Sequence, residues 1–159
     1  MATSAVPAGC HTATPYLMVK GAAKAIEFYK RVFGAVEVMR LSGPDGKVAH
    51  AEIRIGDSML MLADESPEWG NRGPETMGGT PVFIALYLPD VDAVAARAVE
   101  AGAKILIPVA DQFYGDRMGR LADPFGHIWL VATHKEDVSA EEMQKRFIAM
   151  TASAPSATA

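Results

Sequence analysis

The sequence has very little cysteine and no long hydrophobic run. Its 159 residues include a single cysteine, Cys10, so an intrachain disulfide and a C-x-x-C zinc site are both excluded. The apolar runs are short, strand-sized pieces such as residues 105–107, far below the roughly 18 residues that a membrane span requires. The first residues also lack the charged segment and apolar stretch of a signal peptide. These absences predict a cytoplasmic protein that does not enter a membrane.

Positive charge is also scarce. The chain has 15 Lys and Arg against 19 Asp and Glu, a net charge of −4, whereas nucleic-acid-binding domains normally carry a basic patch. Nucleic acid is therefore not an expected partner. Apolar residues make up 50% of the chain and charged residues 21%, which is the composition of a globular domain and not of a disordered one.

Both ends of the chain read as tails. Residues 1–13 and 151–159 consist mostly of Ala, Ser, Thr and Pro, with too little apolar bulk to offset the entropy of ordering, so we expect them to be disordered. Between the tails the sequence repeats itself. We expect one module over residues 14–63 and a second over residues 80–134, joined by a Gly- and Pro-rich linker loop over residues 64–79.

Each module reads as a strand, a helix and three further strands. In the first module Gly34 ends an apolar pattern at helical spacing, and in the second Asp90 is a plausible N-cap and Gly102 ends the helix. The expected strands cover residues 14–19, 36–41, 48–55, 58–63, 82–88, 104–108, 119–122 and 128–132. The pattern predicts an α+β fold of two βαβββ modules. A capping box of Ser139 and Glu142 predicts a C-terminal helix over residues 139–150.

One helix can cover only one face of a four-stranded sheet, so the other face must be buried against the second module, a partner chain or a ligand. We therefore expect the two mixed sheets to curl around a concave crevice. Alternation along residues 48–55 separates an apolar row from a polar row that should face the crevice. The polar row is Val48, His50, Glu52 and Arg54. An offset of 70 between the repeats carries His50 onto Arg120, which should face the crevice too.

Several of these positions have a competing structural interpretation. The polar row is equally consistent with the solvated face of an edge hairpin, and Arg120 with an ion pair to Asp116 or Asp123. Trp69, in the linker, is expected either to cover the crevice as a lid or to fill the seam between the modules. Trp129 is expected in the core, because its neighbours take the opposite face of their strand.

The sequence resembles a known superfamily. The duplicated βαβββ pattern, the segment Ala25-Ile26-Glu27-Phe28-Tyr29 followed by Phe33-Gly34-Ala35, and Asp123-Pro124-Phe125-Gly126-His127 before the last strand resemble the vicinal oxygen chelate superfamily. That superfamily includes glyoxalase I, extradiol dioxygenases, fosfomycin-resistance enzymes and bleomycin-resistance proteins. The resemblance covers residues 14–133. Residues 114–117 and 126–129 look most like the PhnB-like branch of the glyoxalase/bleomycin-resistance proteins.

The resemblance also implies where a metal would sit. The family's metalloenzymes place His, Glu or Gln on inward strand positions and hold a divalent ion that chelates substrate oxygens. Those positions carry Thr14, Leu60 or Met61 (depending on strand register), Phe83 and Leu130 in this sequence. None of them offers the oxygen or nitrogen donors that a hard divalent ion prefers. We therefore expect neither a metal nor another cofactor.

Two functions of different classes remain. The first is a metal-independent binding protein that holds a small hydrophobic or aromatic molecule, as the bleomycin-resistance proteins do, and forms a homodimer that shares the crevice. Its expected ligand-binding residues are Thr14, Tyr16, Met61, Trp69, Phe83, Arg120 and Leu130. The alternative is a glyoxalase-like lyase, isomerase or other enzyme, in which His50 and Glu52 act as the catalytic acid–base pair and Arg120 holds an anionic group.

Overall fold

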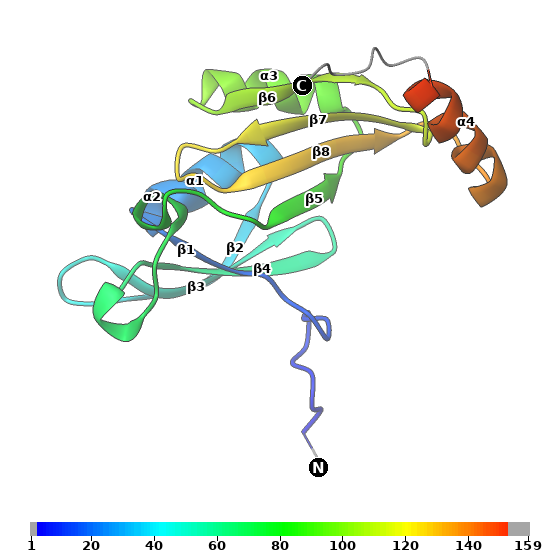
Figure 1. Cartoon of the computed structure of the whole chain (residues 1–159). Coiled ribbons are helices and arrows are strands. Elements are labelled where there is room, and N and C mark those ends of the chain that lie inside the picture. Colours follow the sequence, from blue (N-terminus) through cyan, green and yellow to red (C-terminus); the bar gives the residue numbers. More distant parts are fainter. Residues whose placement is uncertain (1–2, 153–159) are drawn as a thin grey trace.

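The computed structural model describes residues 3–152, and it contains two modules of the same topology (Figure 1). The first module comprises β1 (Tyr16–Val19), α1 (Ala22–Phe33), β2 (Val36–Ser42), β3 (Val48–Ile55) and β4 (Ser58–Asp64). Its strands form a sheet in the order β1-β4-β3-β2, in which β1 runs parallel to β4 and the other pairs are antiparallel.

The second module repeats this arrangement. It comprises β5 (Phe83–Tyr87), α3 (Val91–Glu100), β6 (Lys104–Asp111), β7 (Asp116–Ala122) and β8 (Ile128–His134), with the strand order β5-β8-β7-β6. The predicted α+β fold of two βαβββ modules is thus confirmed, and neither sheet closes into a barrel.

A side chain from the neighbouring strand accepts hydrogen bonds from the first N–H groups of α1, and another does the same for α3. In the first module the Asp64 carboxylate accepts hydrogen bonds from the backbone N–H groups of Gly21 and Ala22, at 2.8 and 2.9 Å. In the second, the Thr133 hydroxyl accepts one from the N–H of Val91 at 2.9 Å. Both acceptors lie on the strand that pairs with the one preceding the helix, and they satisfy N–H groups that a helix leaves free at its first turn. The repeat is therefore preserved at the level of individual hydrogen bonds.

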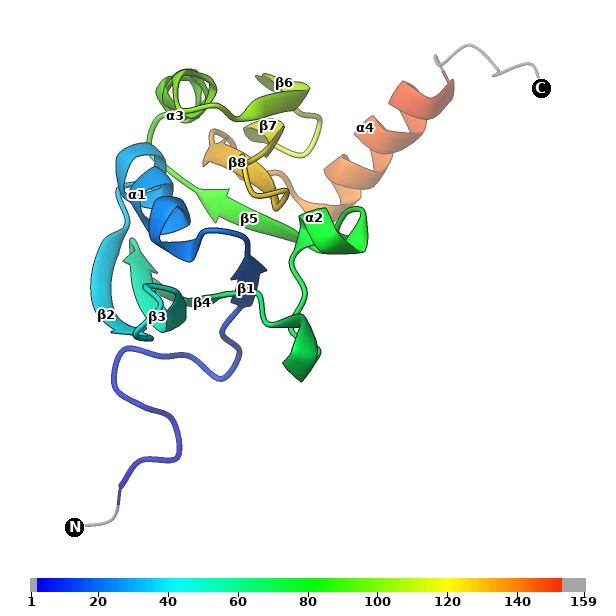
Figure 2. The same cartoon turned by 90° about the vertical axis from the view of Figure 1, so that its left-hand side faces the viewer.

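The core lies on the helix-covered faces of the two sheets, and it joins the modules. Helices α1 and α3 lie side by side (Figure 2). Trp129 of β8 is fully buried, as predicted, and its ring lies 5.2 Å from that of Tyr29 and 4.8 Å from that of Phe33, both on α1. Helix α1 thus packs against both sheets, which leaves the opposite face of each sheet without a helix.

We call these uncovered surfaces the first and second open faces. Strand pairing places Tyr16, Met18, His50, Glu52, Arg54 and Met61 on the first open face. It places Phe83, Ala85, Tyr87, Met118, Arg120, Leu130 and Ala132 on the second. Tyr16, Phe83 and Tyr87 are large apolar side chains that remain exposed there.

The β3 strand departs from the predicted alternation at its first two residues. From His50 onward the polar row is correct, but Val48 is buried and Ala49 is exposed, the reverse of the prediction. The pairing of β2 with β3 shifts register between Leu41 and Ser42, and such a bulge turns the following side chains to the other face. The Val48 N–H donates to Asp64 at 2.8 Å, which fixes the shifted backbone.

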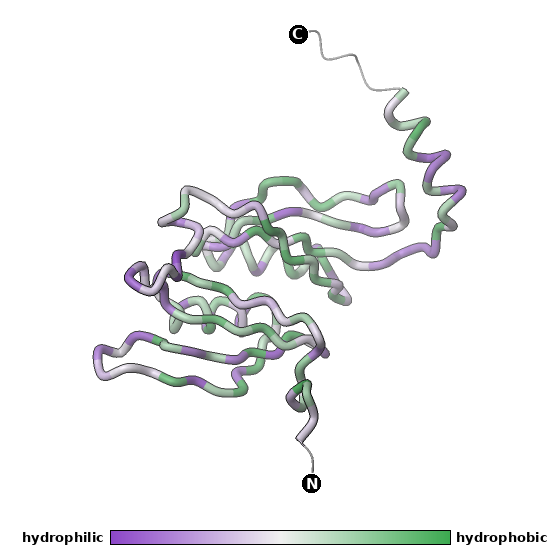
Figure 3. The backbone as a smooth tube through the Cα atoms, turned by 60° about the horizontal axis from the view of Figure 1, so that its bottom comes forward, coloured by the Kyte–Doolittle hydropathy of each residue, from purple (hydrophilic) through white to green (hydrophobic). Residues whose placement is uncertain are grey.

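Other element boundaries also differ from the prediction. The linker, expected to be a loop, contains the 3₁₀ helix η1 (Pro67–Trp69) and the short helix α2 (Pro74–Met77). Strand β6 continues past Pro108, which an edge strand tolerates because its N–H positions can face solvent. In Figure 3 hydrophobic residues run along the strands of both sheets, whereas the C-terminal helix mixes hydrophobic and hydrophilic residues.

The two ends of the chain differ in the described part. Residues 3–13 contain no helix or strand, although Gly9 lies against Met59 of the first sheet. Helix α4 (Ala140–Ala152) is capped by Ser139, whose hydroxyl accepts from the N–H of Glu142, and it runs into the predicted C-terminal tail. The rest of that tail, residues 153–159, lies outside the described residues. No helix in the described part of the chain combines the length and apolarity needed to cross a membrane.

Candidate functional site

A cavity of about 600 Å³ lies at the seam between the modules, where the edge strands β1 and β5 meet the linker. We call it the seam cavity. Its walls are mostly apolar: Pro15, Tyr16, Leu17, Met18, Pro74, Met77, Pro81, Val82, Phe83, Ile84 and Ala85 line it. The polar side chains are few, and the two that can carry a positive charge are Arg72 and His127. A large apolar hollow with a few polar groups is the usual form of a small-molecule site.

Helix α2 closes one side of the seam cavity, and Glu65 holds it there. One Glu65 oxygen accepts from the Gly73 N–H at 3.0 Å, and the other accepts from the Thr76 hydroxyl at 2.9 Å. The hydrogen bond from Gly73, followed by that from Thr76, lowers the pKa of the Glu65 carboxyl. The backbone of Gly73 passes so close to β1 that a Cβ there would lie 2.8 Å from the Met18 carbonyl oxygen. Only glycine fits this contact.

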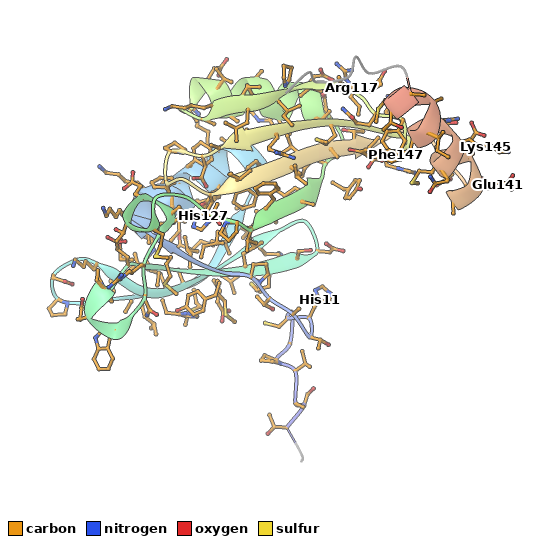
Figure 4. The ribbon with its side chains drawn as sticks, in the orientation of Figure 1. His11, Arg117, His127, Glu141, Lys145 and Phe147 are labelled. Atoms are coloured by element: carbon orange, nitrogen blue, oxygen red, sulfur yellow. The ribbon has the colours of Figure 1, made fainter. Side chains whose placement is uncertain are left out.

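His127 joins the two modules at the cavity wall (Figure 4). Its Nε2 lies 3.0 Å from the backbone carbonyl oxygen of Met18. A carbonyl oxygen can only accept, so Nε2 carries the hydrogen, and in the neutral ring Nδ1 is left as an acceptor. Arg72 lies on the linker and forms no ion pair or hydrogen bond with any other residue of the described range 3–152. The cavity thus has a fixed imidazole and a free guanidinium at its edge.

The first open face carries a chain of three polar side chains. The Tyr16 hydroxyl lies 2.8 Å from Nδ1 of His50, and Nε2 of His50 lies 3.5 Å from a Glu52 oxygen. Because a carboxylate accepts only, Nε2–H faces Glu52, and in the neutral ring Nδ1 accepts the hydrogen of the Tyr16 hydroxyl. Both ring nitrogens of His50 are therefore engaged. Of the three side chains, Tyr16 is the most exposed.

The second open face carries a guanidinium without an acid partner. The Arg120 guanidinium carbon lies 4.6 Å from the centroid of the Phe83 ring, a cation–π contact. Its Nε is the one buried side-chain nitrogen or oxygen in the described residues that lacks a hydrogen-bond partner. The ion pair to Asp116 or Asp123, considered as an alternative, is absent, because both carboxylates are taken up by other donors.

Strand register also changes which residue of the first module corresponds to Arg120. Met61 pairs with Tyr16 and Glu52, whereas Leu130 pairs with Ala85 and Arg120. Glu52, not His50, is therefore the counterpart of Arg120. The prediction used an offset taken from a turn glycine, and the turn between β7 and β8 is longer than that between β3 and β4, so an offset measured at the turn does not hold along the strands.

All but two of the predicted site residues, Thr14 and Trp69, fall into three places. Tyr16 and Phe83 meet at the seam cavity, His50, Glu52 and Met61 lie on the first open face, and Arg120 and Leu130 lie on the second. Neither His50 nor Arg120 lines the seam cavity. Thr14 is half-buried just before β1. Trp69 stands on η1 with 81% of its surface exposed, so within one chain it is neither a lid nor a plug.

The positions that hold a metal in the resembled enzymes do not fit one here. Register places Met61 on the first open face and Leu60 in the core, which resolves the ambiguity between them. The resulting set is Thr14, Met61, Phe83 and Leu130, with a hydroxyl as its only oxygen donor. Within residues 3–152 no three His, Cys, Asp or Glu side chains are grouped so as to hold a metal ion.

Sequence reasoning missed Arg72, Met77 and the role of His127. The first two lie in the segment treated as a linker, and nothing in the linker's composition signals that α2 folds against β1. His127 was visible as part of the motif before the last strand, but its contact with Met18 links positions 109 residues apart. Only the packing of the two modules brings these residues to one cavity.

Comparisons with known proteins agree with this fold. The family model described as the glyoxalase/bleomycin resistance protein/dioxygenase superfamily matches residues 10–131. Protein Mb0911c of Mycobacterium bovis is 46% identical over 134 residues, which cover 82% of this chain and 88% of that protein.

Solved structures show the same fold at lower identity. Protein PA1353 from Pseudomonas aeruginosa superimposes with a TM-score of 0.67 at 21% identity, over 79% of this chain and 99% of that one. A structure from Bacillus cereus, titled as a putative 3-demethylubiquinone-9 3-methyltransferase, PhnB protein, gives 0.59 at 22% identity, over 77% and 99%. Both likenesses concern the fold alone.

Proposed function

This chain belongs to the glyoxalase/bleomycin resistance protein/dioxygenase superfamily, and within it we propose that the protein binds a small hydrophobic or aromatic molecule without using a metal ion. The observation that carries the proposal is the seam cavity. Its volume of about 600 Å³ is within the usual range for small-molecule pockets, and two aromatic rings, Tyr16 and Phe83, face it from different modules. Met77 adds an adaptable thioether, which suits a ligand that binds by burial and stacking.

The chemistry at the family's metal positions supports the same proposal. Met61, Phe83 and Leu130 offer apolar surface in places where a chelating enzyme needs oxygen or nitrogen donors. Such surface gains free energy by leaving water, at about 25 cal/mol for each Å² buried. Of the three, Phe83 also lines the seam cavity, so its ring adds apolar surface to a ligand bound there.

We further propose that the working form is a homodimer whose second copy covers the open faces and completes the crevice. Apolar side chains are exposed on both sheets, including Leu41 on the first and Ile107 and Tyr87 on the second. Large apolar side chains exposed on an uncovered sheet face are the kind of surface that a partner chain covers. Glu52 and Arg120, which occupy equivalent positions on the two open faces, carry opposite charges and suit a pairing between the faces.

A ligand screen tests the binding proposal. Aromatic and cationic drug-like compounds are tested by thermal shift and the hits by calorimetry, on the wild type and on Phe83→Ala and Met77→Ala. Hits are expected to raise the melting temperature, and both variants to weaken binding roughly tenfold because each removes cavity wall. Val99→Ala, an exposed apolar residue on α3, is the matched control and should bind as the wild type does. A screen without any stabilising compound would count heavily against the proposal.

The second candidate is an enzyme in which His50 and Glu52 form the acid–base pair and Arg120 holds an anionic group. The arrangement of Tyr16, His50 and Glu52 favours it: the Tyr16 hydroxyl is hydrogen-bonded to His50, Glu52 lies 3.5 Å from the other ring nitrogen, and a carboxylate beside an imidazole is a common proton-transfer arrangement. Within one chain His50 and Arg120 lie on different sheets, so the reaction would need a second copy to bring them together. If His50→Ala leaves the turnover of every candidate substrate unchanged, this alternative is excluded.

A further inference from the structure

A second cavity, also about 600 Å³, lies at the far end of the second open face. It is bounded by the end of β5, the turn between β6 and β7, the end of β8 and the first turn of α4. Tyr87, Tyr114, Asp116, His134, Asp137 and Met143 supply its chemistry. It shares no lining residue with the seam cavity, and no Lys or Arg is among its lining residues. We call it the acidic cavity.

Asp116 is the buried acid of this cavity, with only 6% of its surface exposed. One of its oxygens accepts from the Tyr87 hydroxyl at 2.8 Å, and the other accepts from Nδ1 of His134 at 2.7 Å. No guanidinium or ammonium group forms an ion pair with this carboxylate in the described part of the chain. A buried charge needs compensation, and among the described residues His134 is the side chain paired with Asp116 that carries a positive charge when it is protonated.

His134 lies between two carboxylates. Its Nδ1 faces Asp116, and its Nε2 lies 3.0 Å from an oxygen of the exposed Asp137. Both ring nitrogens can donate at once only when the ring is protonated. The hydrogen bond to Asp116, and then that to Asp137, raises the pKa of His134 above its ordinary value. With His134 protonated the three side chains sum to −1 (−1 −1 +1), and with it neutral they sum to −2.

Two phenol rings and a thioether form the rest of the wall. Tyr87 keeps 64% of its surface exposed, so its ring is free to make contacts although its hydroxyl is engaged. The hydrogen bond to Asp116 raises the pKa of Tyr87, and burial raises that of Tyr114 with a further contribution from the charge of Asp116. Both phenols therefore keep their protons at neutral pH and present neutral aromatic rings, with Met143 beside them.

The wall that α4 contributes is held in place by several contacts. Arg146 of α4 pairs with Glu136 at 2.9 Å and donates to the Phe113 carbonyl oxygen, and the Phe147 ring (Figure 4) lies 5.6 Å from that of Phe113. The Gly115 carbonyl oxygen accepts hydrogen bonds from the N–H groups of residues 135 and 136, at 2.9 Å each, which ties the turn before β7 to the segment that leads from β8 into α4. These contacts hold α4 against the second module, so the wall that α4 gives to the acidic cavity has a defined position.

We propose that the acidic cavity binds a small organic cation, an alkylated ammonium group, which its carboxylates attract and its tyrosine rings contact. Carboxylates repel an anion. Because Asp116, Asp137 and His134 together carry a net negative charge in either state of His134, a cation gains an electrostatic attraction here that a neutral ligand lacks. Aromatic faces beside negative charge are the arrangement that recognises quaternary ammonium groups. The ammonium group competes with the charge of His134 for the same carboxylates, so binding is tighter when His134 is neutral.

Choline and tetramethylammonium are suitable probes, because their charge does not change with pH. The matched neutral control is 3,3-dimethyl-1-butanol, which has the shape of choline without its charge. Binding is followed by calorimetry and by NMR shifts at about pH 6 and about pH 8.5, on either side of the expected titration of His134. We expect the cations to bind roughly tenfold or more tightly than the alcohol, and more tightly at the higher pH.

Variants assign the effect to the cavity. Tyr114→Leu and Asp137→Asn should each weaken cation binding roughly fivefold, while Glu141→Gln on the exposed side of α4 should not change it. His134→Gln should remove the pH dependence. The proposal is overturned if the alcohol binds as well as choline, if neither cation binds, or if Tyr114→Leu binds choline like the wild type. Because the seam cavity is separate, these results do not depend on the function proposed for it.

Discussion

At the scale of single residues, three aspartates that are buried or partly buried hold this fold together, and sequence alone did not reveal their role. Asp64 caps α1, Asp116 joins β5 to β8, and Asp123 joins the two modules. A sequence shows an aspartate near a turn but not the donors that reach it from 94 residues away. The polar row of β3 was predictable from alternation at His50, Glu52 and Arg54, but the bulge that buries Val48 depends on pairing with another strand.

The first prediction concerns Asp123, a carboxylate that four hydrogen bonds satisfy. One oxygen accepts from the Tyr29 hydroxyl and the Trp129 indole N–H, both at 2.8 Å, and the other accepts from the N–H groups of Phe125 and His127. In Asp123→Asn the amide nitrogen cannot accept, so two buried donors lose their partner. We expect a loss of about 2–4 kcal/mol in the free energy of unfolding, measured by denaturant titration.

The matched control for this prediction is Asp57→Asn. Asp57 is an exposed turn residue whose carboxylate meets only the neighbouring Ser58 hydroxyl, so its variant should unfold at nearly the wild-type midpoint. Equal stability of the Asp123→Asn and wild-type proteins would show that Asp123 does not join the modules as described.

The second prediction concerns the titration of His134. Because Asp116 and Asp137 raise its pKa, the Cε1 proton of His134 should titrate above the ordinary histidine value of about 6.5. A raised pKa contributes stability that is fully present below the unfolded value and is lost as pH rises through the folded one. Asp116→Asn should lower the pKa more than Asp137→Asn does. An NMR titration, with His134→Gln to assign the signal, measures all three, and a wild-type value at or below 6.5 contradicts the prediction.

At the scale of elements, the strands and long helices were predictable because their patterns are periodic, whereas the linker was not. Residues 64–79 show no helical period, yet η1 and α2 form there because Pro67 and Pro74 start short helices and Glu65 anchors the second one. The prediction ended strand β6 at Pro108, whereas it continues to Asp111. Proline has no N–H to donate, so it interrupts a strand inside a sheet, but β6 is an edge strand, where that N–H is not needed.

The third prediction tests how α2 is seated on β1. The backbone of Gly73 has φ −83°, which any residue adopts, so the effect of Gly73→Ala is steric: its Cβ meets the Met18 carbonyl oxygen at 2.8 Å. We expect a loss of about 1–3 kcal/mol in unfolding free energy, together with weaker binding of any seam-cavity ligand. In the control, Gly43→Ala, the one close approach of the Cβ is to the exposed carboxylate of Asp45, and the nearest backbone atom is at an ordinary contact distance of 3.9 Å, so little change is expected in thermal melts. Similar melting of both variants would contradict the close seating of α2.

At the scale of the whole molecule, the duplication was visible in the sequence, but the relation of the two modules was not. Two sheets with one helix each can be joined in several ways, and here α1 packs against both. As a result the open faces carry His50 and Arg120 on separate sheets of one chain, and only the edge strands meet at the seam cavity. The choice between Leu60 and Met61, which the sequence left open, required the strand register: Met61 lies on the first open face and Leu60 in the core.

The fourth prediction follows from the exposed open faces. If a second copy covers them, Ile107→Glu on the second open face should shift the protein from dimer to monomer in analytical ultracentrifugation, because the interface would bury an unpaired charge. Val99→Glu, which places the same charge on exposed α3, should leave the association state unchanged. A wild type that sediments as a monomer at all concentrations would remove the basis for a shared crevice.

The most direct test of the account is a crystal structure of the protein with the best compound from the ligand screen. The account predicts electron density for that compound in the seam cavity, in contact with Tyr16 and Phe83, and no metal ion at Met61 or Leu130. A seam cavity filled by protein side chains, or a metal ion bound between the open faces, would contradict it.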